Sequence, residues 1–256
     1  MEIITEADGL AEVDHKKALQ VIVDKIVFTY LLIINAICKR NNVDDGHGAV
    51  HAYTVMLHTQ RALVFEKCTP MQQECVLIAA LMHDIDDHKF FPFGSNNAAR
   101  LLQNHSHQEL ILRMIDLVSC SQNGNSRDGV PHWMLIPRDA DRLEAVGKIG
   151  IIRCIEYTRA KARPMHTPET PLCFTIEEFW TAAKGKYDEY LLTGKSASMQ
   201  DHCLDKLPHM FMATGNFYID RKMKRRNDYI PKFYIQYSLA RQNNESDNFI
   251  KTFEHL

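Results

Sequence analysis

The chain has 256 residues, 45% of them hydrophobic and 24% charged, which is the composition of a globular protein that can bury a sizeable core. The formal net charge of −2 excludes the strongly basic balance of a dedicated nucleic-acid-binding protein. Seven cysteines without a C-x-x-C pair exclude a disulfide framework or a cysteine zinc cage and predict a reduced, cytoplasmic protein.

The first predicted helix runs from about Asp14 to Arg40, where apolar residues recur at helical spacing. Between Ile26 and Cys38 it becomes almost entirely apolar, over about half the length that a bilayer span requires. The polar residues Asp24, Lys25 and Asn35 border or interrupt this stretch. We therefore interpret it as a buried helix and expect no membrane partner.

Two further helices are predicted on either side of Thr69-Pro70, from about Ala49 to Lys67 and from Pro70 to about Asp84. The second is an apolar run that ends in the doublet His83-Asp84. Ionised carboxylates are costly to bury unless they are paired or bind a metal, and imidazole with carboxylate suits a hard or borderline divalent ion. One helix end cannot complete such a shell, so the doublet predicts ligands elsewhere in the chain.

The remaining sequence also has helical periodicity, with neither a strand pattern nor an internal repeat. The fold class is therefore predicted to be all-α. Within the helix expected from Trp133 to Ala160, Gly147 and Gly150 are small positions that another helix could approach closely. The other helices are predicted at about residues 97–103, 109–119, 176–192, 198–214 and 216–243. We divide the chain into an N-terminal helical extension (1–40), a metal-binding core (41–160) and a C-terminal helical part of the same domain (161–256).

Candidate partners for the doublet lie in two places. His51 falls in the first turns of its helix, four residues before Val55 on the same face, so its ring can point to the edge of the core. Asp141 falls in a helix whose apolar side carries Leu143 and Val146. Four ligands would then neutralise a divalent ion and leave open positions for water and substrate: His51, His83, Asp84 and Asp141.

Two rival ligands remain open. His47 precedes His51 by four residues, and Asp139 precedes Asp141 by two, which places those carboxylates roughly 200° apart around a helix of 3.6 residues per turn. A two-metal centre with additional histidine ligands is a further alternative. Its candidate ligands are His88, His105, His107 and His132.

A His, then a His-Asp doublet and then a distant Asp is the defining pattern of the HD-domain metal-dependent phosphohydrolases, which the chain resembles over roughly residues 40–240. The resemblance covers residues 47–55, 79–90 and 139–150 and continues weakly through 163–164 and 201–207. It is closest to the small bacterial-type HD nucleotide pyrophosphohydrolases, from which Gly48 departs because that subgroup often has Asp there. The resemblance implies an HD-domain helical bundle, carrying here an N-terminal extension and C-terminal helices.

The resemblance also implies roles for individual residues. His51, His83, Asp84 and Asp141 match the ligands of one divalent ion, which could be Mn, Mg, Fe, Ni, Co or Zn, with Mn favoured. Asp87 matches an acidic position that often assists catalysis, and His47 is a second candidate for proton transfer. Lys89, Lys206 and His88 are the predicted substrate-binding residues, preferred over Arg142 and Arg163.

The expected reaction is hydrolysis of a nucleoside triphosphate to a monophosphate and pyrophosphate by a metal-activated water. The alternatives are a phosphomonoesterase, a cyclic-nucleotide phosphodiesterase and a non-catalytic HD module that binds a nucleotide. The expected partner is a small phosphorylated molecule, and a homodimer is left open. The basic run at residues 221–226 lacks interleaved aromatic residues, so we interpret it as a solvated helix face rather than a nucleic-acid site.

Overall fold

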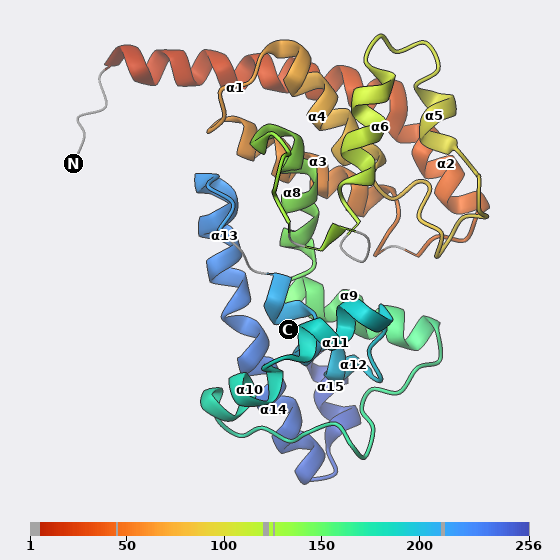
Figure 1. Ribbon diagram of the computed structural model, residues 1–256, viewed down its shortest axis with the longest axis vertical. Coiled ribbons are helices and arrows are strands. Elements are labelled where there is room, and N and C mark those ends of the chain that lie inside the picture. Colours follow the sequence, from red (N-terminus) through yellow and green to blue (C-terminus); the bar gives the residue numbers. More distant parts are fainter. Residues whose placement is uncertain (1–5, 45, 120–122, 125, 211–212, 256) are drawn as a thin grey trace. The chain divides into compact units, whose positions relative to one another are not determined.

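The computed structural model describes residues 6–44, 46–119, 123–124, 126–210 and 213–255 (Figure 1). Every regular element in these ranges is helical, which confirms the predicted all-α class. The first elements are α1 (Glu6–Ile26), the π-helical turn η1 (Val27–Leu31), α2 (Leu32–Arg40), α3 (Ala49–Leu63), α4 (Pro70–Met82), α5 (Asn97–Leu101), α6 (Gln108–Asp116) and the 3₁₀ turn η2 (His132–Leu135). They are followed by α8 (Ile136–Glu144), α9 (Gly147–Ala160), α10 (Ile176–Ala183), α11 (Lys186–Thr193), α12 (Met199–Asp205), the 3₁₀ turn η3 (Leu207–Met210), α13 (Phe217–Asn227), α14 (Tyr229–Gln242) and α15 (Ser246–His255).

The chain divides into two compact units. The first contains residues 1–141 and 215–219, and the second contains residues 142–214 and 220–256. The division therefore falls between Asp141 and Arg142, inside α8, whereas the sequence placed the end of the core near residue 160.

Helix α4 is the buried centre of the first unit, where it packs against α1, α3 and α6. Thr69 and Gln72 form a capping box at its start, in which each side chain accepts a hydrogen bond from the backbone of the other residue. Pro70 occupies the first helical position, where its missing N–H has no intrahelical partner to lose. All residues from Cys75 to Met82 are buried, so the apolar run delivers the His83-Asp84 doublet to the interior.

Helices α1 and α2 form one continuous helix through η1 (Figure 1). Ile26 and Ile34 are both buried, although eight residues on a regular α-helix would set them about 80° apart. The wider π-helical turn between them accommodates one additional residue and keeps both side chains on the same face. The opposite face is exposed, with Phe28 at 90% and Leu32 at 78% of their full accessible area, so our interpretation of this stretch as a buried helix was wrong.

The helix predicted from Trp133 to Ala160 is divided into η2, α8 and α9. The break before α9 falls at Gly147, whose φ of +74° lies in the left-handed region that glycine tolerates best. A Cβ atom at Gly147 would lie 3.0 Å from Cβ of Arg226 on α13. The expected close approach at Gly147 is therefore confirmed, and the same glycine also begins a new helix.

In the second unit, α14 packs against α9, α10 and α15. Its core is aromatic, with the rings of Phe233 and Phe253 4.7 Å apart between centroids. The helix predicted at residues 176–192 is divided into α10 and α11 at Gly185, where φ is +77°. The last helix, α15, was not predicted from the sequence.

Candidate metal centre

Three separate elements of the first unit bring potential metal ligands together. His51 lies in the first turn of α3, His83 directly follows the end of α4, and Asp141 lies on α8. One ligand atom from each of these residues lies within 4.8 Å of the other two. Segments separated by up to 90 positions in the sequence thus converge on one point.

Two imidazole nitrogens and two carboxylate oxygens surround this point. Asp141 Oδ1 lies 3.2 Å from His51 Nε2 and 3.6 Å from His83 Nε2. Asp84 Oδ2 lies 3.3 Å from His83 Nε2 and 3.7 Å from His51 Nε2. The four side chains predicted as ligands are therefore all present at the same place.

The orientation of His83 shows why the cluster suits a cation. Its Nδ1–H donates to the carbonyl oxygen of Ala80 at 2.8 Å, which leaves Nε2 as the lone-pair nitrogen of the neutral ring. This Nε2 atom is buried and makes no hydrogen bond among the described residues. A lone pair that faces two carboxylates is repelled unless a proton or a metal ion lies between them, so the donor set fits a divalent ion.

Electrostatics support the same conclusion. Burial alone would lower the pKa of His83, but the Asp84 and Asp141 carboxylates outweigh it and raise that pKa well above its usual value. Burial alone would raise the pKa of Asp141, but the adjacent His51 and His83 rings hold it well below its usual value. The pKa of Asp84 is lowered in the same way, against burial and mainly by His83. These carboxylates stay ionised and attract positive charge.

Asp139, the rival of Asp141, lies in a different environment. It is 1% exposed, and both of its carboxylate oxygens accept hydrogen bonds from Arg127 Nη1, at 3.1 and 2.9 Å. Arg138 Nε donates to the same carboxylate at 3.3 Å. Asp139 is thus held by two arginines.

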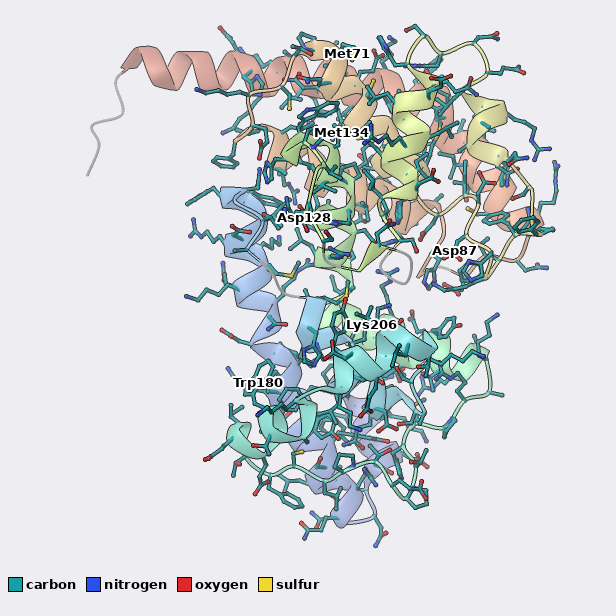
Figure 2. All side chains as sticks on the ribbon, in the orientation of Figure 1. Met71, Asp87, Asp128, Met134, Trp180 and Lys206 are labelled. Carbon is teal, nitrogen blue, oxygen red and sulfur yellow. The ribbon has the colours of Figure 1, made fainter. Side chains whose placement is uncertain are left out.

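Asp87 lies in the segment between α4 and α5 (labelled in Figure 2). Asp87 does not lie on a helix, because α4 ends at Met82 and a turn follows. Within this turn the backbone N–H of Asp87 donates to the carbonyl oxygen of Asp84 at 3.1 Å. The Asp87 carboxylate accepts hydrogen bonds from the backbone N–H of Lys89 at 2.9 Å and from its Nζ at 3.3 Å. The neighbouring His88 is exposed, with Nδ1 3.5 Å from Asp87 Oδ1.

His47 lies beside the first ligand histidine, with the two ring centroids 6.3 Å apart. Its Nδ1 is 2.9 Å from the Asp44 carboxylate, and its ring is 4.8 Å from that of Phe90. The backbone N–H of Phe90 donates to the carbonyl oxygen of Asp87. Phe90 therefore contacts both proton-transfer candidates, His47 through its ring and Asp87 through its backbone.

The remaining candidates lie elsewhere. Lys206 belongs to the second unit, where its Nζ lies 5.3 Å from the centroid of the Tyr190 ring, and its substrate-binding role stays a prediction. His132 Nδ1 is 3.2 Å from Glu66, and the rings of His105 and His107 adjoin each other. Among the described residues, the group that could hold an ion contains none of these three histidines.

Sequence reasoning missed the role of Asp86. Its carboxylate accepts hydrogen bonds from Ser95 Oγ at 2.8 Å and from the backbone N–H groups of Asn97 and Ala98 at 2.7 and 2.9 Å, at the start of α5. The Asn97 side chain donates to the carbonyl oxygen of Ile85 at 2.8 Å. The Ser-Asn-Asn sequence at residues 95–97 was the available signal, because such residues favour helix starts.

No protein-family model matches the sequence. The chain is 36% identical over 233 residues to the uncharacterized protein L803 of Acanthamoeba polyphaga mimivirus, a match that covers 80% of this chain and 95% of that protein. A solved structure from Lactobacillus plantarum is similar with a TM-score of 0.61 and 20% identity, and the match covers 84% of this chain and 98% of the other. A Bacillus thuringiensis structure described as an HD-superfamily hydrolase is similar with a TM-score of 0.55 and 19% identity, over 88% and 98% of the two chains.

Proposed function

We propose that the chain, which shares the fold of an HD-superfamily hydrolase, belongs to that superfamily and is a metal-dependent phosphohydrolase that acts on a nucleotide. The preferred reaction is cleavage of a nucleoside triphosphate between its α- and β-phosphates, which releases a monophosphate and pyrophosphate. The observation that carries the proposal is the convergence of His51, His83 and Asp141 around the buried Nε2 of His83, with the Asp84 carboxylate at its edge.

His51, His83, Asp84 and Asp141 would hold the ion. Their two nitrogens and two oxygens suit a transition ion that accepts both donor types, of which Mn²⁺ is favoured, and the two carboxylates balance its charge. When bound, such an ion lowers the pKa of a water molecule and polarises a phosphoryl oxygen. The hydrogen bond from His83 to the Ala80 carbonyl fixes the ring so that Nε2 faces the site.

Asp87 would move the proton. Asp87 follows Asp84 in the same turn, and its carboxylate would accept a proton from the attacking water or return one to the leaving oxygen. Lys89 contacts Asp87 through a partly exposed ammonium group, which can turn towards a phosphate oxygen when substrate binds. His47 is the second proton-transfer candidate, because the Asp44 carboxylate orients its ring beside His51.

The test is product analysis with purified protein, Mn²⁺ and a panel of nucleoside triphosphates, monophosphates and cyclic nucleotides. We expect pyrophosphate and a monophosphate from at least one triphosphate, and loss of this activity in Asp84→Asn. The matched control is Asp128→Asn, which changes an exposed carboxylate (labelled in Figure 2) that contacts Ser126 Oγ at 3.2 Å. Orthophosphate from a monophosphate, opening of a cyclic nucleotide, or tight binding without turnover would contradict the preferred reaction and identify the alternative.

A further inference from the structure

The loop at residues 87–95 carries two adjacent phenylalanines in different surroundings. Phe91 is 3% exposed, whereas Phe90 is only partly buried. The backbone N–H groups of both residues donate to the carbonyl oxygen of Asp87, at 2.9 Å from Phe90 and 3.0 Å from Phe91. Phe91 therefore anchors the loop to the interior, and Phe90 stays partly accessible beside it.

Hydrogen bonds hold this loop at its far end as well. The backbone N–H of Ser95 donates to the carbonyl oxygen of Pro92 at 3.1 Å, and the Ser95 hydroxyl donates to the Asp86 carboxylate at 2.8 Å. The same carboxylate accepts a hydrogen bond from the backbone N–H of Asn97 at 2.7 Å. The backbone position of Phe90 is thus fixed by contacts that do not involve its ring.

The Phe90 ring is connected to the metal centre through His47. The ring centroids of Phe90 and His47 are 4.8 Å apart, and those of His47 and His51 are 6.3 Å apart. His47 Nδ1 lies 2.9 Å from the Asp44 carboxylate, which orients the His47 ring between its two neighbours. The rings of His47 and Phe90 therefore form an aromatic wall that begins beside a predicted metal ligand and leads away from it.

An aromatic wall in this place fits one part of a nucleotide. When the α-phosphate lies at the metal centre, a ribose separates it from the base, so the base lies near the centre without contacting the ion. Aromatic side chains stack on nucleobases of every kind, because each base has a π-face. Lys89, which adjoins Phe90 in the chain and whose side chain is 44% exposed, offers positive charge for the phosphates of the same molecule.

We propose that Phe90, supported by His47, stacks on the base of the substrate, so that the site selects nucleotides over other phosphate esters. Phe90 has no hydrogen-bonding group in its side chain, and selection among bases requires such groups. The site should therefore accept purines and pyrimidines alike. The inference rests on the proposed function, because it places a substrate phosphate at the metal centre.

Isothermal titration calorimetry of the Mn²⁺-loaded full chain with adenosine monophosphate and with ribose 5-phosphate isolates the contribution of the base. The parent should bind adenosine monophosphate about tenfold more tightly than ribose 5-phosphate, and the other three common monophosphates within about threefold of adenosine monophosphate. Phe90→Leu should remove most of the preference, because leucine keeps the apolar character but has no π-face. Phe90→Tyr should retain it.

The matched control is Phe65→Leu. It changes a 50% exposed phenylalanine of the same unit, whose ring lies 5.2 Å from that of Phe217, and should bind both ligands like the parent. Melting temperature and metal content check each variant, and Phe90→Ile repeats the test if Phe90→Leu loses either. With a hydrolysed triphosphate, Phe90→Leu should raise KM about tenfold at little-changed kcat, since stacking contributes equally before and during the reaction.

The outcomes separate this inference from the proposed function. Equal binding of the two ligands by a parent that hydrolyses nucleoside triphosphates would overturn the inference and leave the reaction standing. A preference for adenosine monophosphate that Phe90→Leu retains would also overturn it, because the base would then lie elsewhere. A preference that depends on Phe90, in a protein that hydrolyses no nucleotide, would support the stacking role and contradict the proposed reaction.

Discussion

Asp139 and Asp141 lie two residues apart on α8 and hold their carboxylates in different environments. Asp141 Oδ1 lies 3.2 Å from His51 Nε2 in the metal centre, whereas Asp139 accepts two hydrogen bonds from Arg127. Two residues of α-helix turn a side chain by about 200°, so one acid of the pair can face the cluster while the other anchors the preceding loop.

This separation predicts different results for two otherwise equal substitutions. Asp141→Asn should remove most of the bound metal and the activity, because the ligand loses its charge. Asp139→Asn should retain the metal but lower the free energy of unfolding by about 3 kcal/mol, because it breaks a buried ion pair. Metal analysis and urea denaturation check both, and metal loss from Asp139→Asn alone would move the last ligand by two positions.

The geometry also predicts the metal stoichiometry. Elemental analysis should find about one divalent ion per chain, and Asp84→Ala should lose it together with activity. His105→Ala and His107→Ala should keep the ion, since neither residue is in the group that could hold it. Two ions per chain that depend on these histidines would instead support a two-metal centre.

Asp87→Asn separates proton transfer from metal binding. Asparagine can still accept the hydrogen bond from the Lys89 backbone, so the turn should persist. Turnover should fall by about 10²–10⁴-fold at unchanged metal content, the usual contribution of a positioned acid or base. Asp128→Asn is the control for an exposed aspartate. Full activity in Asp87→Asn would transfer the proposed role to His47.

Metal removal should destabilise only part of the chain. A ligand at 100 times its dissociation constant stabilises the state that binds it by about 2.7 kcal/mol, so a chelator should lower the melting temperature of the first unit. The second unit should melt unchanged, because all four ligands belong to the first. Asp84→Ala should melt equally with and without chelator, and a chelator effect in that variant would place the stabilising ion elsewhere.

The second unit should respond to pH through Asp205. Burial is the main cause that raises the pKa of this carboxyl to about 7, while the hydroxyl of Ser196, 2.9 Å away, partly opposes the shift. In the unfolded chain the pKa of an aspartate is about 3.9, so the folded state binds this proton more tightly than the unfolded state. The proton therefore stabilises the folded state fully below about pH 4, and this stabilisation is lost as pH rises through about 7. Asp205→Asn should remove this loss, on the order of a few kcal/mol.

Urea denaturation between pH 4.5 and 8 measures the Asp205 effect. The parent should lose stability across this range more steeply than Asp205→Asn. Asp188→Asn, which changes an exposed aspartate of the same unit, is the control and should follow the parent. Parallel curves for the parent and Asp205→Asn would show that the carboxyl is ionised throughout.

The apolar run before His83-Asp84 predicted a buried helix that ends near a pair of ligands. This prediction was possible because both signals, the apolar run and the charged doublet, can be read from residues that are neighbours in the sequence. The resemblance of the flanking motifs to HD-domain proteins was likewise confirmed at the level of the fold. The end of α4 at Met82 could not be read in this way, since no glycine or proline marks it. The divided helices at Gly147 and Gly185 depend on a positive φ, which helical periodicity does not report.

The π-helical turn η1 was also not predicted, because an additional residue within a nearly all-apolar stretch hardly changes the pattern of apolar residues. Similarly, nothing local distinguishes Asp139 from Asp141. Their difference depends on Arg127, which lies 12 residues away in the chain and reaches Asp139 only in the folded first unit.

The turn that follows α4 connects two parts of the molecule. Asp84 borders the metal centre, and two residues later Asp86 holds the first N–H groups of α5. A segment with ligands at one end and a helix cap at the other should open and close as one cooperative unit. Amide hydrogen exchange in residues 85–98 should therefore become faster when the metal is removed. Metal bound at the centre would then control how often the start of α5, some ten residues further along the chain, opens.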